Sequence, residues 1–154
     1  MKRSIERTGI ALVFSAVWIV SMTAPAQAAG PCSLERAAGK WGFTDNGTVV
    51  GVGPRIATGV LTLDAAGNLL DGIATSSLNG TIADETFSGT YTVNADCTGT
   101  LTGEIYISGV LAYTVTLNLA FDENMAHMRG LFTSAVESNG TSLPTVVALD
   151  ANRQ

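Results

Sequence analysis

The sequence predicts an all-β protein, built as an eight-stranded antiparallel up-and-down barrel. Apolar and polar residues alternate with a period of two through three consecutive segments between Phe87 and Phe121. This period places each set of side chains on its own face of a strand, whereas a helix would mix the two sets. In the last segment the apolar positions are Leu111, Tyr113, Val115, Leu117, Leu119 and Phe121.

Turn signals between such segments recur roughly every 8 to 12 residues, which is typical of all-β domains. Eight sequential antiparallel strands close most simply into a barrel, because closure leaves no strand edge exposed. A two-sheet β-sandwich is the alternative.

The N-terminal segment has the pattern of a secretory signal. Basic residues (Lys2, Arg3 and Arg7) precede an apolar run from Gly9 to Val20, and Ala26-Gln27-Ala28 supplies the small residues of a cleavage site. The apolar run is shorter than the about 20 residues that a membrane-spanning helix needs. We therefore expect cleavage after Ala28 (signal peptide 1–28), a secreted or periplasmic location, no integral membrane insertion after cleavage, and a single domain over 29–154.

The charge of the predicted mature chain limits its partners. Residues 29–154 hold five basic and twelve acidic side chains, so the net charge is 5 − 12 = −7. Such a surface offers little to the phosphates of DNA or RNA, and we expect no nucleic-acid partner. The sequence also predicts no cofactor and no metal.

Two cysteines, Cys32 and Cys97, remain in the mature chain. In an oxidising compartment the expected outcome is a disulfide between them. The chain-entropy model assigns a bridge that closes so long a loop about 4 kcal/mol.

The chain divides into a helical turn at 33–38 and eight strands. We expect the strands at 39–44, 56–64, 68–78, 87–93, 100–108, 111–121, 126–137 and 143–149. Asp45-Asn46-Gly47 is expected to break the first strand, residues 48–55 to form a loop or irregular edge, and Asp84-Glu85 to lie in a loop. Asn-Gly is the preferred type I′ dipeptide, so Asn46-Gly47, Asn79-Gly80 and Asn139-Gly140 each predict a hairpin turn.

Gly39-Lys40-Trp41 at the start of the first strand is similar to the Gly-x-Trp signature of the calycin superfamily, which comprises lipocalins, fatty-acid-binding proteins and avidins. The resemblance implies that Trp41 plugs one end of the barrel. It also implies that a basic residue from the last strand packs over this Trp, a part that Arg153 could play.

A second resemblance covers about half of the predicted domain. The segments GVLTLDAAGN (59–68) and SGTYTVNADCTGT (88–100) resemble the repeated pattern of small, secreted, largely uncharacterised bacterial β-barrel proteins. That pattern in turn resembles the barrel of the allene oxide cyclase type. The resemblance implies a fold and a compartment but no catalytic residue.

Candidate ligand-binding residues, besides Trp41, form two pairs within the strands. Glu104 and Tyr106 share a face of the fifth strand, and His127 and Arg129 share a face of the seventh. If both faces line the interior, these side chains form a polar cluster that orients a ligand in an apolar cavity. The usual apolar-in, polar-out alternation places them in solvent instead.

The leading hypothesis is a barrel that binds a small apolar ligand in its interior without turnover. A cyclase or isomerase that uses a preformed cavity is the first alternative, and a structural or surface protein with a filled barrel is the second. No G-x-S-x-G elbow is present to support serine nucleophilic catalysis. An outer-membrane barrel is disfavoured because the strands lack aromatic girdles.

Overall fold

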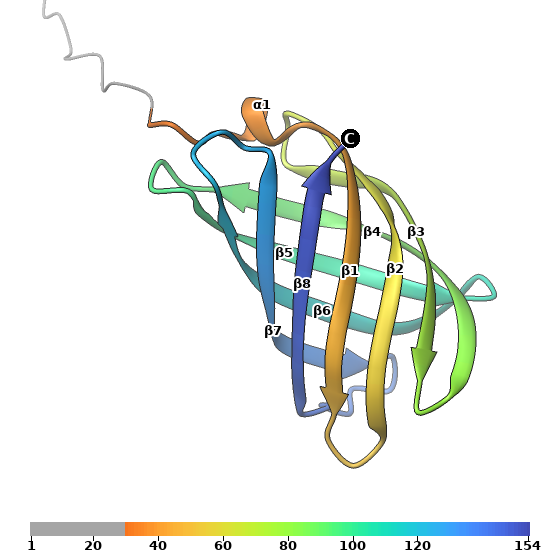
Figure 1. Cartoon of the computed structure of the whole chain (residues 1–154). Coiled ribbons are helices and arrows are strands. Elements are labelled where there is room, and N and C mark those ends of the chain that lie inside the picture. The colour runs from red at the N-terminus through yellow and green to blue at the C-terminus, as the bar shows by residue number, and fades with distance from the viewer. Residues whose placement is uncertain (1–29) are drawn as a thin grey trace, which may run out of the picture.

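The computed structural model describes residues 30–154, so the predicted signal peptide lies outside the described residues. Within these residues the chain forms one short helix followed by eight strands (Figure 1). The elements are α1 (Leu34–Ala37), β1 (Gly39–Val49), β2 (Gly53–Leu63), β3 (Asn68–Leu78), β4 (Thr81–Val93), β5 (Thr98–Ile107), β6 (Val110–Phe121), β7 (His127–Glu137) and β8 (Thr145–Arg153).

The strands form a closed barrel in sequence order, each antiparallel to the next. Closure comes from β8, which pairs with β1 from Trp41 opposite Arg153 to Val49 opposite Thr145. The predicted eight-stranded up-and-down barrel is confirmed, and the β-sandwich alternative is wrong.

The strands extend into all three predicted interruptions, so two of these predictions are wrong, and of the predicted loop at 48–55 only residues 50–52 form a turn. β1 continues through Asp45-Asn46-Gly47 to Val49, β2 begins at Gly53, and β4 begins at Thr81 and includes Asp84-Glu85. Gly47 does not form a turn, but it allows β1 and β8 to approach each other closely. A Cβ atom at this position would lie 2.0 Å from the carbonyl oxygen of Val146 in β8. Asp45, Arg55 and Glu85, which belong to these segments, lie buried inside the barrel.

The other two Asn-Gly pairs do form turns. Asn79 and Gly80 connect β3 to β4 and both have positive φ angles, of 50° and 87°, as a type I′ turn requires. Asn139 and Gly140 lie in the loop between β7 and β8, where the Gly140 N–H donates to the carbonyl of Glu137.

One end of the barrel, here called the closed end, carries α1. The Ser33 side chain accepts a hydrogen bond from the backbone N–H of Arg36 and so caps this helix. Cys32 and Cys97 form the predicted disulfide, which ties the segment before α1 to the turn between β4 and β5. The Trp41 indole Nε1 donates to the Ala37 carbonyl at 2.9 Å, which fixes α1 over the barrel end.

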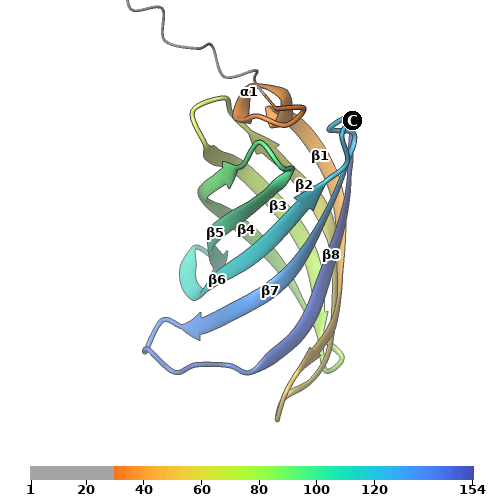
Figure 2. The same cartoon turned by 90° about the vertical axis from the view of Figure 1, so that its left-hand side faces the viewer.

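The opposite end, here called the open end, is formed by the short turns at 50–52, 79–80 and 108–109 and by the loop 138–144. Near it β7 and β8 diverge (Figure 2), since only His127 to Leu131 of β7 pair with β8. The loop bridges this seam: Leu143 N–H donates to the Ala135 carbonyl, and Val50 N–H donates to the Pro144 carbonyl.

Candidate functional site

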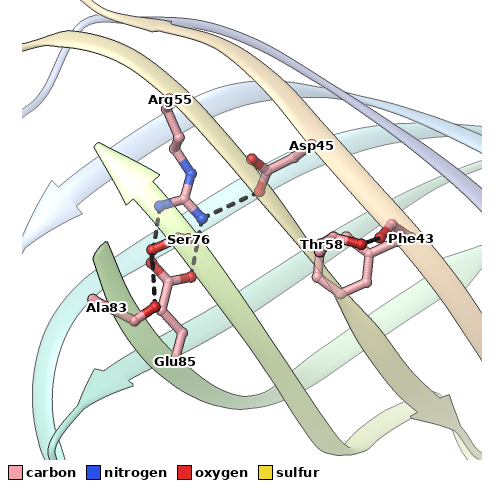
Figure 3. Close-up of polar contacts among 7 residues, drawn as sticks. All are labelled: Phe43, Asp45, Arg55, Thr58, Ser76, Ala83 and Glu85. Atoms are coloured by element: carbon pink, nitrogen blue, oxygen red, sulfur yellow. Dashed lines mark hydrogen bonds and ion pairs between the residues drawn. The ribbon is translucent and has the colours of Figure 1, made fainter. Parts of the chain in front are cut away.

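A cluster of charged side chains lies inside the barrel, contributed by three different strands (Figure 3). Asp45 comes from β1, Arg55 from β2 and Glu85 from β4, and they are only 2%, 8% and 2% exposed. Arg55 donates from Nη1 to Glu85 Oε1 at 2.9 Å and from Nη2 to Glu85 Oε2 at 3.0 Å. Its Nη2 also donates to Asp45 Oδ2 at 3.2 Å. The geometry is the two-pronged pairing that suits a guanidinium and a carboxylate.

One carboxylate oxygen in this cluster has no hydrogen-bond partner among the described residues. Glu85 is fully engaged, because the Ser76 hydroxyl also donates to its Oε1 at 2.7 Å. Asp45 Oδ2 accepts from Arg55, but Asp45 Oδ1 is buried without a hydrogen-bond partner among residues 30–154. Buried polar atoms are normally paired, so an unpaired carboxylate oxygen marks this position as unusual.

The electrostatics of the cluster follow from its burial. Burial raises the pKa of the Asp45 carboxyl, and the Arg55 charge and the backbone at Ala57 offset the rise only in part. Burial acts to lower the pKa of Arg55, but its bonds to Glu85 and Asp45 outweigh this and raise the pKa, so Arg55 stays charged. The pKa of the nearby Tyr113 hydroxyl is raised by burial and by Glu85. The cluster thus holds one fixed positive charge.

Two narrow cavities flank the Arg55 side chain. The inner one, of about 40 Å³, has apolar walls and includes Asp45 and Glu85. The outer one, of about 30 Å³, lies toward the open end and is lined by Val49, Leu143 and Val147 among others. Arg55 and Phe132 border both cavities. Each is large enough for water, which needs about 10–15 Å³ measured in this way.

A larger hollow of about 300 Å³ lies at the open end. Its walls include Ser76 from the charged cluster and the Tyr113 side chain, together with Leu78 and Ala83. Leu78 and Tyr113 also line the outer cavity, so the hollow, the outer cavity and the inner cavity follow one another into the barrel.

Exposed apolar side chains gather around this opening. Five of them lie within three residues of the open-end turns or the loop, and each is between 43% and 69% exposed. They are Val50, Val52, Ile82, Val110 and Val146.

The closed end has no such opening. Trp41 is 0% exposed and packs edge-on against the Phe121 ring, with 6.2 Å between the ring centroids. Arg153 pairs with Trp41 across β8 and β1, and its guanidinium donates to the carbonyls of Arg36 and Ala38. Both residues therefore lie at the closed end, as the calycin resemblance implied, and Trp41 lines none of the three spaces described above.

The other four candidate residues lie on the outside of the barrel. Glu104 and Tyr106 alternate with the inward Gly103 and Ile105, and the Tyr106 hydroxyl donates to Glu104 Oε2 at 2.7 Å on the surface. His127 and Arg129 also point outward, on β7, where Nε2 of His127 lies 2.9 Å from Asp150 Oδ2. The structure does not bring these pairs together with the interior cluster.

Sequence reasoning missed Asp45, Arg55 and Glu85, although a signal was present. The period of two that places Trp41 and Phe43 inside continues to Asp45, and the inward series Leu61, Gly59 and Ala57 leads back to Arg55. On β4, Tyr91, Gly89 and Phe87 lead back to Glu85. Opposite charges at inward positions of neighbouring strands would have predicted a buried pair.

The comparisons with known proteins concern the fold of the chain. No protein-family model and no curated protein matches the chain. Among solved structures, EF1p2_mFAP2b bound to DFHBI is 12% identical, with 80% of this chain and 98% of that chain covered and a TM-score of 0.52. A redesigned β-barrel, mFAP0, bound to DFHBI is 16% identical (77% and 99% covered, TM-score 0.49), and Rv2717c from M. tuberculosis is also 16% identical (79% and 94%, TM-score 0.36). At these identities the likeness concerns the fold alone.

Proposed function

We propose that this protein is a secreted or periplasmic barrel that binds a small, largely apolar molecule in its interior, without turnover. The observation that carries the proposal is the asymmetry of the barrel: one end is plugged, whereas the other has a hollow that shares lining residues with the outer of the two apolar cavities flanking Arg55. Ligand sites are commonly apolar pockets of about 300–1,000 Å³ with a few placed polar groups. The open-end hollow falls at the lower limit of this range.

The dimensions limit the size of the ligand. The cavities beyond the hollow are narrow, so most of the molecule would occupy the hollow, with one edge of it directed toward Arg55. Apolar side chains around the opening favour the approach of an apolar molecule, since contact with them removes water from both surfaces. A small molecule is also compatible with the fold, because EF1p2_mFAP2b is bound to DFHBI.

The compartment is proposed from two features of the chain. The Cys32–Cys97 disulfide fits an oxidising environment outside the cytoplasm. The basic and apolar N-terminal pattern that ends at Ala28 fits export to such an environment.

Binding without turnover is favoured because the acid and base groups of the cluster are engaged with one another. Glu85 accepts from Arg55 and Ser76, and Arg55 is held by both carboxylates. A cyclase or isomerase is the second candidate, and one observation favours it: Asp45 lines the inner cavity and has a raised pKa, as expected of a group that exchanges a proton there.

Native mass spectrometry of the exported protein tests the proposal, with one variant that fills the hollow and one matched control. Ala83→Trp fills the hollow from β4, whereas Ala120→Trp makes the same change on the outer face of β6. We expect a bound small molecule on the wild-type protein and on Ala120→Trp, and its loss from Ala83→Trp.

Recovery of the bound molecule with an unchanged mass but a changed chromatographic retention and NMR spectrum after incubation would favour the cyclase or isomerase, because its product is an isomer of its substrate. Indole and benzofuran, two small fused-ring molecules, serve as probes of the interior. A wild-type protein that carries no small molecule, and that takes up neither probe, would refute the binding function and leave a filled structural barrel.

A further inference from the structure

The unpaired oxygen of Asp45 indicates which kind of ligand the interior accepts. This inference rests on the proposed binding function. Asp45 lines the inner cavity, and its Oδ1 is buried without a hydrogen-bond partner among residues 30–154. We propose that the ligand carries a hydroxyl or N–H group on an apolar body, and that this group donates a hydrogen bond to Asp45 Oδ1.

The charges around the cavity disfavour an anionic ligand. Both terminal nitrogens of the Arg55 guanidinium already donate to Glu85 and Asp45. The cluster already holds two carboxylates against one guanidinium, so a ligand carboxylate or phosphate would add a third negative charge in a region of low dielectric, which is costly. The cluster therefore acts as an acceptor, and Arg55 holds the acceptor in place.

The apolar walls give the hydrogen bond its selectivity. Asp45 shares the inner cavity with Phe43, Leu61, Leu101 and Leu149, and these side chains offer no competing donor. A ligand without a donor would cover Oδ1 with carbon and leave a buried carboxylate oxygen unsatisfied. A ligand with a donor at this position avoids that penalty, so two ligands of equal shape are expected to differ in affinity.

Indole and benzofuran form a suitable pair of probes. They have the same fused-ring shape, but indole has an N–H group where benzofuran has an oxygen. We expect the wild-type protein to bind indole at least about tenfold more tightly than benzofuran, as measured by calorimetry or by NMR titration, since a hydrogen bond to a charged acceptor is worth about this much or more.

Asp45→Asn should reverse the preference. Its amide oxygen can accept from Arg55 in place of Oδ2, which turns the amide NH₂ toward the cavity and replaces the acceptor there by a donor. The ratio of indole to benzofuran affinity should then fall to about one or below, while the binding of benzofuran is retained.

The wild-type protein provides a second test that does not depend on a variant folding. Protonation of Asp45 would place the proton on Oδ1, because Oδ2 accepts from Arg55. The groups that face Asp45 are Arg55, Glu85 and Tyr113, and burial raises the pKa of the Asp45 carboxyl above its ordinary value. The preference for indole should therefore decline as the pH falls, with benzofuran binding changed less.

The outcomes separate the two proposals. Equal affinity for indole and benzofuran at every pH, in the wild-type protein and in Asp45→Asn alike, would overturn the role of Asp45 and leave the binding function intact. Failure of both probes to bind, together with a wild-type protein that carries no small molecule in native mass spectrometry, would overturn the binding function itself.

Discussion

Removal of the Arg55 charge should destabilise the barrel more than any loss of a surface charge. Arg55 is the single basic side chain that contacts the buried Asp45 and Glu85 among the residues described, and both carboxylates are 2% exposed. Arg55→Met keeps much of the volume of the side chain but leaves two carboxylates close together without a compensating charge. Each would have to be protonated or remain charged in an apolar interior.

The expected magnitude is about 3–5 kcal/mol, the usual cost of breaking a buried ion pair by removing one partner. This is a large part of the 5–15 kcal/mol that separates the folded from the unfolded state of a typical domain. Loss of Arg55 removes an effect that lowers the pKa of Asp45, so the pKa of that carboxyl in the folded variant rises further. The folded variant then binds protons more tightly than the unfolded chain. The loss of unfolding free energy relative to the wild-type protein should therefore become smaller as the pH falls.

Urea denaturation at several pH values measures this effect. Arg129→Met is the matched control: Arg129 is 76% exposed and its Nε lies 4.0 Å from Asp150 Oδ2, so its loss should change the free energy of unfolding by less than about 0.5 kcal/mol. Replacing the whole cluster by Asp45→Leu, Arg55→Met and Glu85→Leu should recover most of the stability lost in Arg55→Met. A cost below about 1 kcal/mol for Arg55→Met would refute the view that the cluster is energetically coupled.

Three further predictions concern the disulfide, the closed end and the outer surface. Cys32→Ser with Cys97→Ser should lower the free energy of unfolding by about 4 kcal/mol, because the bridge spans 65 residues; unchanged urea midpoints would contradict this. Trp41→Ala should cost about 3–5 kcal/mol by leaving a cavity under α1, and Trp41→Phe clearly less; thermal unfolding compares the two, and equal losses would argue against a packing role. Glu104→Gln and His127→Gln, on the outer face, should leave indole affinity in calorimetry within about twofold of wild type, and a larger loss would place the ligand outside the barrel.

The last prediction concerns the pH dependence of the stability of the native protein. The pKa of Asp45 is raised above its ordinary value of 3.8, so its protonated form is favoured by folding. Its contribution to stability is fully present below the unfolded pKa and is lost as the pH rises through the folded pKa. Asp45→Asn should remove this part of the pH dependence, and a carbon-detected NMR titration of the Asp45 carboxyl should show a midpoint above 3.8; a midpoint below it would contradict the burial argument.

Local patterns in the sequence were sufficient for the fold. A period-two alternation depends only on the geometry of one strand, and it located all eight strands, with β3 at its observed bounds of Asn68–Leu78. The disulfide followed from having two cysteines in a chain with a predicted export signal, and Asn79-Gly80 formed its predicted turn because both residues tolerate positive φ.

Only the tertiary structure shows where the charged side chains of the interior lie. Asp45, Arg55 and Glu85 belong to segments that were predicted to be a strand break or loops, because Asn-Gly, the glycines and proline of residues 48–55, and the acidic pair Asp84-Glu85 are turn signals. Closure of the sheet brings the three together across β1, β2 and β4, and each carboxylate meets the guanidinium within 3.2 Å. The sequence by itself determined the strands and their alternating faces, because these depend on neighbouring residues. The buried site depends on pairing between residues 10 and 30 positions apart, and only the closed barrel supplies that proximity.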